Sequence, residues 1–228
     1  MSDVGKKTGK SALAMDQAGS RITTAIGIIT LEHLLGKGKS GHSWLATCGN
    51  GQVVFKRMHH EPCPFYDFGD RNKVEMEVAA YQYLQPFALN LPQLLCACPA
   101  EDYLLKSYVE GVVATHAVID GTLGDDTLSA LFQLARRCQD AQINLDWFPD
   151  NFVIRAGVLH YIDYEFNQYD RRWSWPQWGI YYWLNGSGMA AFKASGDAAH
   201  INAPAASGMP IREPFRQRAN ALIEKFAH

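Results

Sequence analysis

Residues 144–154 read NLDWFPDNFVI and contain the most informative pattern in the chain. It places the carboxylate of Asp146 and the carboxamide of Asn151 in one loop, five positions apart, just before an apolar strand. Such a loop can direct both side chains into a cleft, where Asp146 can orient a hydroxyl and accept its proton while Asn151 binds a metal through its oxygen. A single Asp–Asn pair is also common in turns and helix caps, so its meaning depends on the surrounding sequence.

A second carboxylate follows the next expected strand. Residues 159–162 read LHYI and are expected to be extended, and Asp163 stands at their end, followed by Tyr164 and Glu165. Hard cations such as Mg²⁺ prefer carboxylate oxygens. Asp163 is therefore suited to a Mg²⁺ ion that bridges phosphate groups.

A glycine-rich segment lies far upstream and reads GKGKSG over residues 36–41. Its glycines, Gly36, Gly38 and Gly41, let a backbone approach a phosphate closely. A dinucleotide-binding loop of this kind opens a helix, whereas here a predicted strand follows at residues 43–47. This context favours a flap over ATP phosphates, and the alternative is a plain glycine-rich hairpin.

Lys56 lies within the apolar run VVFKRM of residues 53–58. A lysine that points inward from a strand needs an anionic partner. Nucleotide phosphates would supply one, and a glutamate on the following helix would hold the ammonium group. Glu75 and Glu77 both qualify, and Glu77 is preferred because the sequence after it continues into the apolar face. An outward-facing lysine at a sheet edge is the alternative for Lys56 taken alone.

The pattern of the whole chain predicts an α+β fold in two lobes with a boundary near Glu110. Turn residues such as Gly49-Asn50-Gly51 and hydrophobic periodicity support this division. The expected elements are strands within 28–35, 43–47, 53–58, 94–98, 103–109, 152–154 and 159–162, and helices at 74–84, 127–140 and about 213–226.

This order gives an N-lobe over residues 25–109, with five antiparallel strands and one helix, and a small, mainly helical C-lobe over residues 110–228. Residues 1–24 are rich in Gly, Ser, Thr, Lys and Ala, and we expect a flexible leader there, with order beginning near Ile26.

With these features in this order, residues 31–165 resemble the protein-kinase-like superfamily. The superfamily includes eukaryotic-type protein kinases, RIO- and Bud32-type atypical kinases, lipopolysaccharide-core sugar kinases, and aminoglycoside or choline phosphotransferases. The resemblance implies a two-lobed kinase-like fold that uses ATP and Mg²⁺ as cofactors.

The resemblance also implies a role for each matching residue. These residues are Gly36, Lys37, Gly38 and Gly41 of the nucleotide flap; Lys56, paired with Glu77 and the α- and β-phosphates; Ser107 to Val109 as the hinge beside adenine; Asp146 as the catalytic aspartate; and Asn151 and Asp163 as the metal ligands.

Several positions depart from the pattern of the superfamily. Asn144 stands where a histidine is usual, and Asp150 stands where small-molecule kinases often have glycine. The metal-binding triplet is Asp163-Tyr164-Glu165 rather than Asp-Phe-Gly, and no Ala-Pro-Glu element follows. The activation segment is nearly absent, so switching by phosphorylation of a long activation loop is not expected. These departures favour the compact atypical and small-molecule branches.

The composition of the 228 residues is that of an ordinary soluble domain, with 47% hydrophobic and 19% charged residues. A net charge of −2 provides no strong field for nucleic acid or an anionic membrane. No apolar run is long enough to span a bilayer, and no signal-peptide core follows the first lysines. Five scattered cysteines indicate free thiols in a reducing compartment, so a cytoplasmic location is expected, with delivery into a host cell left open.

Two weaker features are expected to be structural. The segment from His59 to Cys63 and the pair Cys96 and Cys98 contain zinc-ligand types without a usual zinc spacing. The aromatic stretch at residues 173–183 is expected to fill the core of the small second lobe rather than to stack on a ligand.

The expected function is transfer of the ATP γ-phosphoryl group to a hydroxyl acceptor, first of all Ser or Thr of a protein. Small-molecule or sugar hydroxyls are the alternative acceptors. A pseudokinase that only binds nucleotide and an enzyme that transfers AMP to a protein are the rival hypotheses.

Overall fold

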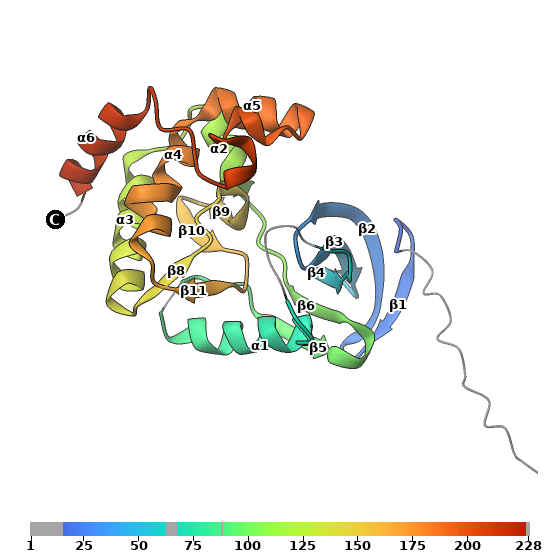
Figure 1. Ribbon diagram of the computed structural model, residues 1–228. Helices are drawn as coiled ribbons and strands as arrows, with labels where there is room; N and C mark the ends of the chain where they lie inside the picture. Colours follow the sequence, from blue (N-terminus) through green and yellow to red (C-terminus); the bar gives the residue numbers. More distant parts are fainter. Residues whose placement is uncertain (1–15, 63–67, 88, 227–228) are drawn as a thin grey trace, which may run out of the picture.

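The computed structural model describes residues 16–62, 68–87 and 89–226. Figure 1 shows an N-terminal lobe built on a curled antiparallel sheet beside a C-terminal lobe made mainly of helices. The sheet has six strands in the order β1-β2-β3-β4-β6-β5. The strands are β1 (Arg21–Thr24), β2 (Gly27–Lys37), β3 (Gly41–Cys48), β4 (Gly51–Met58), β5 (Leu94–Cys98) and β6 (Tyr103–Ser107).

The sixth strand corrects the sequence-based prediction of five strands and of order beginning near Ile26. β1 pairs with β2 in register from Arg21 opposite Thr30, and Ile22 packs against the core of the sheet. The carboxylate of Asp16 also accepts a hydrogen bond from Arg57 at 3.0 Å. The first fifteen residues of the expected leader lie outside the described residues.

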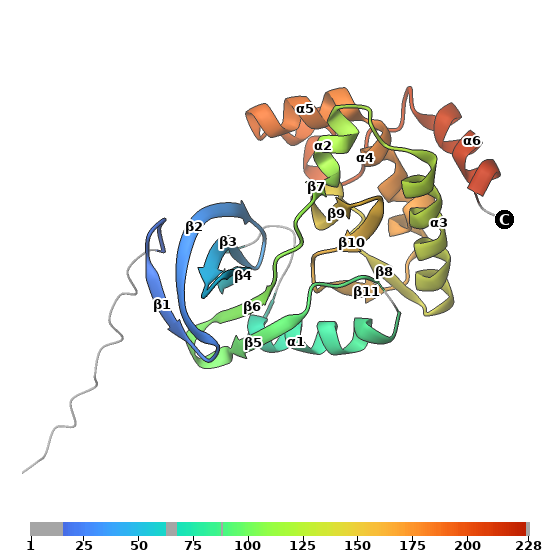
Figure 2. The ribbon, with the colours of Figure 1, turned by 180° about the vertical axis from the view of Figure 1, so that it is seen from behind.

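Helix α1 (Lys73–Leu84) covers one face of the sheet, close to the helix predicted at residues 74–84. The side chain of Asn72 caps it by accepting from the backbone N–H groups of Val74 and Glu75. Val74 packs with Met58 and Leu104 on this face, while a separate apolar cluster around Phe55 fills the other face. Both views show α1 running from beneath the sheet toward the second lobe (Figures 1 and 2).

The C-terminal lobe contains five α-helices and five short strands within the described residues. The helices are α2 (Ala114–Ile119), α3 (Asp125–Asp140), α4 (Ile180–Leu184), α5 (Gly186–Ser195) and α6 (Arg216–Phe226). The strands are β7 (Val112–Val113), β8 (Ile143–Leu145), β9 (Phe152–Arg155), β10 (Val158–Tyr161) and β11 (Phe166–Gln168). They form the sheets β10-β9-β7 and β11-β8. Figure 2 shows α3 and α6 on the side of this lobe that faces away from the N-terminal sheet.

Aromatic side chains form the core of the second lobe. Trp147, Trp175 and Trp183 are almost fully buried, and the rings of Trp175 and Trp183 meet edge to face with centroids 5.6 Å apart. The indole N–H of Trp183 donates to the carbonyl oxygen of Trp147 at 2.8 Å. The expectation that the aromatic stretch of residues 173–183 fills a core is confirmed at Trp175 and Trp183. No helix in the described residues is long and apolar enough to cross a membrane.

Candidate functional site

The loop between β8 and β9 holds Asp146 and Asn151 in a fixed arrangement. The short helix Pro149–Asn151 ends the loop. One oxygen of Asp146 accepts from the backbone N–H of Phe148 at 3.1 Å, and the side-chain amide of Asn151 donates to the backbone oxygen of Asp146 at 3.2 Å. These two bonds fold the loop back on itself and orient both functional side chains.

Asp163 lies in the next loop, between β10 and β11, and this loop is tied to the first. The backbone N–H of Ile162 donates to the carbonyl oxygen of Asn151 at 2.9 Å. The hydroxyl of Tyr161 donates to the carbonyl oxygen of Glu165 at 2.9 Å and accepts from the backbone N–H of Asp146 at 3.4 Å. The structure therefore brings together the three residues that the sequence singles out, Asp146, Asn151 and Asp163.

A buried ion pair faces these loops from the N-terminal lobe. The ammonium of Lys56, on β4, is 2.5 Å from one carboxylate oxygen of Glu77, on α1, and 3.7 Å from Asp163. Only 8% of the Lys56 side chain and 9% of the Glu77 side chain are exposed. Glu75 is exposed on the other side of the helix. The partner of Lys56 is thus Glu77, the preferred one of the two glutamates.

The charges of the site are set by burial and by one another. Burial alone would raise the pKa of Asp163, but the ammonium groups of Lys56, Lys106 and Lys39 hold it below its usual value. Burial alone would lower the pKa of Lys56, but the carboxylates of Glu77 and Asp163 raise it. Both groups are therefore charged at neutral pH. Burial raises the pKa of Asp146, which favours proton uptake by this carboxylate.

The surroundings of the three flap glycines differ in how much room they leave for a side chain. A Cβ atom at Gly36 would meet nothing within 4 Å, and one at Gly38 would meet its nearest atom at 3.7 Å. A Cβ atom at Gly41 would come within 2.5 Å of the backbone oxygen of Arg57 on the neighbouring strand β4. Glycine at position 41 is thus required by strand packing, whereas positions 36 and 38 have room for a Cβ atom.

Lys37 of the flap and the expected hinge residues, Ser107 and Val109, are other sequence-predicted nucleotide contacts. Lys37 forms an exposed ion pair with Glu61 at 2.7 Å, so its ammonium is not brought to the buried pair of Lys56 and Glu77. Ser107, at the end of β6, exchanges hydrogen bonds of 2.8 Å with the backbone of Gln93. Val109 lies in the link between β6 and β7, where the chain passes from one lobe to the other.

Sequence reasoning assigned no role of their own to four polar residues that lie at this site: Lys39, Ser40, Lys106 and Glu165. Lys39, in the flap, lies 2.5 Å from Glu165, and Ser40 donates to Glu77 at 2.9 Å. Lys106, on β6, is buried, donates to the carbonyl oxygen of Ile162 and lies 4.8 Å from the ring centre of Tyr164. The signal that could have revealed Lys106 is the one that revealed Lys56, a lysine inside an apolar strand.

Lys106 differs from Lys56 in its electrostatic surroundings. Burial and the neighbouring ammonium of Lys56 lower the pKa of Lys106 to about 8, and Asp163 offsets only part of this. In the sheet Lys56 stands opposite Leu104, two residues before Lys106. Side chains two apart on a strand share a face, so both lysines point to the same side of the sheet.

The carboxylate of Asp163 and the carboxamide of Asn151 offer oxygen atoms, the type of donor that Mg²⁺ prefers. In the parts of the chain that the structure describes, no three or more His, Cys, Asp or Glu side chains are arranged to hold a metal ion. Mg²⁺ usually takes one or two carboxylates together with phosphate oxygens. Asn151 donates through its nitrogen, which leaves its oxygen for a cation near Asp163. Cys63 of the histidine–cysteine segment lies outside the described residues.

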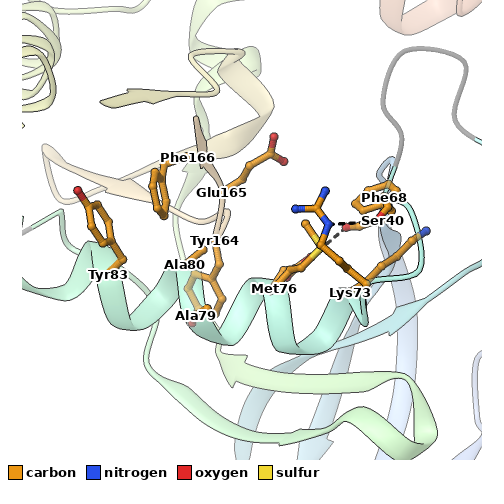
Figure 3. Close-up of a pocket in the computed structure, with 12 residues that line it drawn as sticks. Ser40, Phe68, Lys73, Met76, Ala79, Ala80, Tyr83, Tyr164, Glu165 and Phe166 are labelled. Carbon is orange, nitrogen blue, oxygen red and sulfur yellow. Dashed lines mark hydrogen bonds between the residues drawn. The ribbon is translucent and has the colours of Figure 1, made fainter. Parts of the chain in front are cut away.

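A cavity of about 430 Å³ lies along α1 rather than at the link between the lobes. Figure 3 shows Met76, Ala79 and Ala80 of α1 on one side of it and Tyr164 and Glu165 facing them. Ser40 and Phe68 lie toward one end of the same cavity (Figure 3). Glu165 lines this cavity and also pairs with Lys39, so the cavity adjoins the charged side chains described above.

Comparisons with known proteins find similarity only at the level of structure. No protein-family model and no curated protein sequence matches the chain. The BubR1 kinase domain is similar with a TM-score of 0.43 and 13% identity, over 65% of this chain and 49% of that domain. The Mycobacterium tuberculosis PknI kinase domain is similar with a TM-score of 0.41 and 16% identity, over 65% of this chain and 61% of that domain.

A cysteine-to-alanine mutant of the same PknI domain has a TM-score of 0.42 and 16% identity, over 67% of this chain and 63% of that domain. The chain thus spans between about half and just under two thirds of the kinase domains that it matches. The two-lobed α+β architecture and the pairing of Lys56 with Glu77 are features of this chain's own structure, and they agree with the fold that the sequence resemblance implies.

Proposed function

We propose that this protein is a phosphotransferase that moves the γ-phosphoryl group of ATP to a hydroxyl acceptor. The observation that carries the proposal is the convergence of Asp146, Asn151 and Asp163 opposite the buried Lys56–Glu77 pair. Two loops of one lobe and two elements of the other supply these five side chains. A purely local role in turns or helix caps would not explain why Asp163 lies 3.7 Å from a buried lysine of the other lobe.

Each residue then has a role that its surroundings support. Lys56, held by Glu77, binds phosphate oxygens of the nucleotide. Asp163 and the side-chain oxygen of Asn151 would hold Mg²⁺, which would supply positive charge against the charge that develops on the transferred group. Catalysis of this kind depends mainly on positioning and on electrostatic stabilisation, so the fixed geometry of the two loops matters more than covalent chemistry.

Asp146 orients the acceptor and receives its proton. One of its oxygens accepts from the backbone N–H of Phe148, which fixes the orientation of the carboxylate. As the new bond forms between the acceptor oxygen and the γ-phosphorus, the bond from that phosphorus to the bridging oxygen breaks and ADP leaves. The hydroxyl proton passes to Asp146, whose pKa is raised by burial.

We propose Ser or Thr of a protein as the first acceptor class. A small-molecule or sugar hydroxyl is the second candidate, and one observation favours it. β11 begins at Phe166, three residues after Asp163, so little chain is present there to bind a polypeptide.

Transfer from γ-labelled ATP with Mg²⁺, offered to protein and metabolite fractions separately, tests the proposal. We expect label in one fraction with the wild-type chain and none with Asp163→Ala. Asp146→Ala should reduce transfer roughly 100-fold or more and leave ATP binding intact.

Three outcomes would contradict this function. Transfer by Asp146→Ala at the wild-type rate would remove Asp146 from its role. Nucleotide binding without any transfer would favour the pseudokinase. A product whose added mass is that of AMP would favour AMP transfer.

A further inference from the structure

Lys39 connects the flap to the catalytic loops of the other lobe. Its ammonium lies 2.5 Å from a carboxylate oxygen of Glu165, and 32% of the Lys39 side chain and 22% of the Glu165 side chain are exposed. The carboxylates of Asp146 and Asp163 also act on this ammonium and, together with Glu165, raise the pKa of Lys39 against the opposing effect of burial. Lys39 thus brings a positive charge from the flap to the carboxylates of the other lobe, in addition to the charges of Lys56 and Lys106.

The backbone that carries Lys39 is fixed from several sides. The hydroxyl of Ser40 donates to Glu77 at 2.9 Å, and the backbone oxygen of Ser40 accepts from the N–H of His59 at 3.1 Å. The N–H of Gly38 donates to the oxygen of Gly41 at 2.9 Å, which closes a tight turn around Lys39. Lys39 can therefore change partners by rotating its long side chain while the flap backbone stays in place.

We propose that Lys39 is a tethered counter-ion that exchanges Glu165 for the γ-phosphate when a nucleoside triphosphate binds with Mg²⁺. The inference rests on the proposed function and adds to it a residue that distinguishes a triphosphate from a diphosphate. A terminal phosphate carries more negative charge than one carboxylate and accepts strong charge-assisted hydrogen bonds. A Mg²⁺ ion held by Asp163 would then supply positive charge beside this carboxylate, so Lys39 could leave the acidic groups.

Binding measurements test this without any transfer reaction. Calorimetry with Mg²⁺ compares the dissociation constants of ADP and of the non-hydrolysable β,γ-methylene analogue of ATP. We expect Lys39→Met to weaken the triphosphate analogue roughly 10-fold and to leave ADP unchanged. Lys39→Arg, which keeps the charge, should restore most of the preference. Lys225→Met is the control, because Lys225 forms an exposed ion pair with Asp125 in the C-terminal lobe and has no part in the proposed site.

A double-mutant cycle separates the exchange from simple repulsion by Glu165. Glu165→Gln should strengthen binding of the triphosphate analogue, because Lys39 then no longer has to leave a carboxylate. In the Lys39→Met background this gain should disappear. A gain of equal size in both backgrounds would overturn the exchange.

The outcomes also distinguish this inference from the proposed function. If the wild-type chain binds neither nucleotide, the proposed function fails. If the wild-type chain binds both and the folded Lys39→Met variant keeps the wild-type ratio of the two dissociation constants, only the role of Lys39 fails. Thermal unfolding of each variant establishes that it is folded.

Discussion

Lys56 and Lys106 are two buried lysines on one face of the same sheet, yet their surroundings act in opposite directions. Lys56 has the carboxylates of Glu77 and Asp163 beside it, and its pKa is raised. Lys106 donates to a neutral carbonyl group, and burial lowers its pKa to about 8. The state of a buried lysine therefore depends on the charges that the fold brings to it rather than on burial alone.

Glu77→Gln tests the buried pair at the residue scale. The substitution removes the nearer carboxylate and leaves the ammonium of Lys56 with Asp163 at 3.7 Å, so we expect the free energy of unfolding to fall by up to about 3 kcal/mol in urea titrations. Glu75→Gln is the matched control on the exposed side of α1 and should change it by less than about 0.5 kcal/mol. Equal effects of the two changes would count against Glu77 as the partner.

The lowered pKa of Lys106 predicts a pH-dependent stability. An unfolded lysine titrates near pH 10.4 and Lys106 near pH 8, so between these values the folded state binds fewer protons at this residue than the unfolded state does. Its contribution to the free energy of unfolding therefore rises as the pH rises from about 8 to about 10. Urea titrations across this pH range give the difference in free energy of unfolding between the wild type and Lys106→Met. The contributions of titrating groups common to both proteins cancel in this difference. A difference that stays flat would contradict the lowered pKa.

At the scale of elements, the flap shows how one glycine motif serves two purposes. A side chain at Gly36 would face open space and one at Gly38 would make an ordinary contact, whereas Gly41 lies against the backbone of β4. The motif predicts a phosphate flap, and the structure adds a packing requirement at its last glycine.

Alanine substitutions in the flap distinguish these purposes. Gly41→Ala should lower the free energy of unfolding by about 1–3 kcal/mol, because the added Cβ meets the oxygen of Arg57 at 2.5 Å and the strands must shift. Gly38→Ala, whose Cβ has an ordinary contact at 3.7 Å, should change it by less than about 0.5 kcal/mol. Urea denaturation of both variants provides the comparison, and similar losses would remove the packing explanation.

The edge strand β1 makes a further prediction. It pairs with β2, places Ile22 against the core, and continues from the Asp16–Arg57 ion pair. A chain of residues 25–228 should therefore be less stable than one of residues 16–228 by at least about 1 kcal/mol. Thermal unfolding of the two chains checks this. Equal unfolding temperatures would mean that β1 adds nothing to the sheet.

At the scale of the whole molecule, several contacts join the two lobes around the site. Lys39 reaches Glu165, Lys56 reaches Asp163, and the ring of Tyr83 on α1 stacks on Phe166 with centroids 4.4 Å apart. The nucleotide proposed here would bind where these contacts meet.

Ligand binding should therefore stabilise the whole molecule. With Mg²⁺ and the β,γ-methylene ATP analogue at about 100 times its dissociation constant, the unfolding temperature should rise by roughly 5–10 °C. Removal of Mg²⁺ with a chelator should reverse most of this shift in the wild type and change little in Asp163→Ala. A wild-type shift that is independent of Mg²⁺ would contradict the metal role of Asp163.

Much of the architecture could be predicted from local patterns. The periodicity around Val74 predicts α1, the Gly49-Asn50 turn predicts the β3–β4 hairpin, and the order of charged residues predicts the cluster. β1 was missed because its short segment follows a run of Gly, Ser and Thr that is typical of disorder, and only its pairing with β2 makes it a strand.

Periodicity and spacing along the chain are enough to predict the two-lobed α+β plan and the candidates Lys56, Glu77, Asp146, Asn151 and Asp163. The contact of Lys39 with Glu165 and the lowered pKa of Lys106 emerge only in the folded molecule. This is because charge interactions depend on distance in space. Local sequence patterns do not predict which ammonium and carboxylate groups the packing of the two lobes brings together.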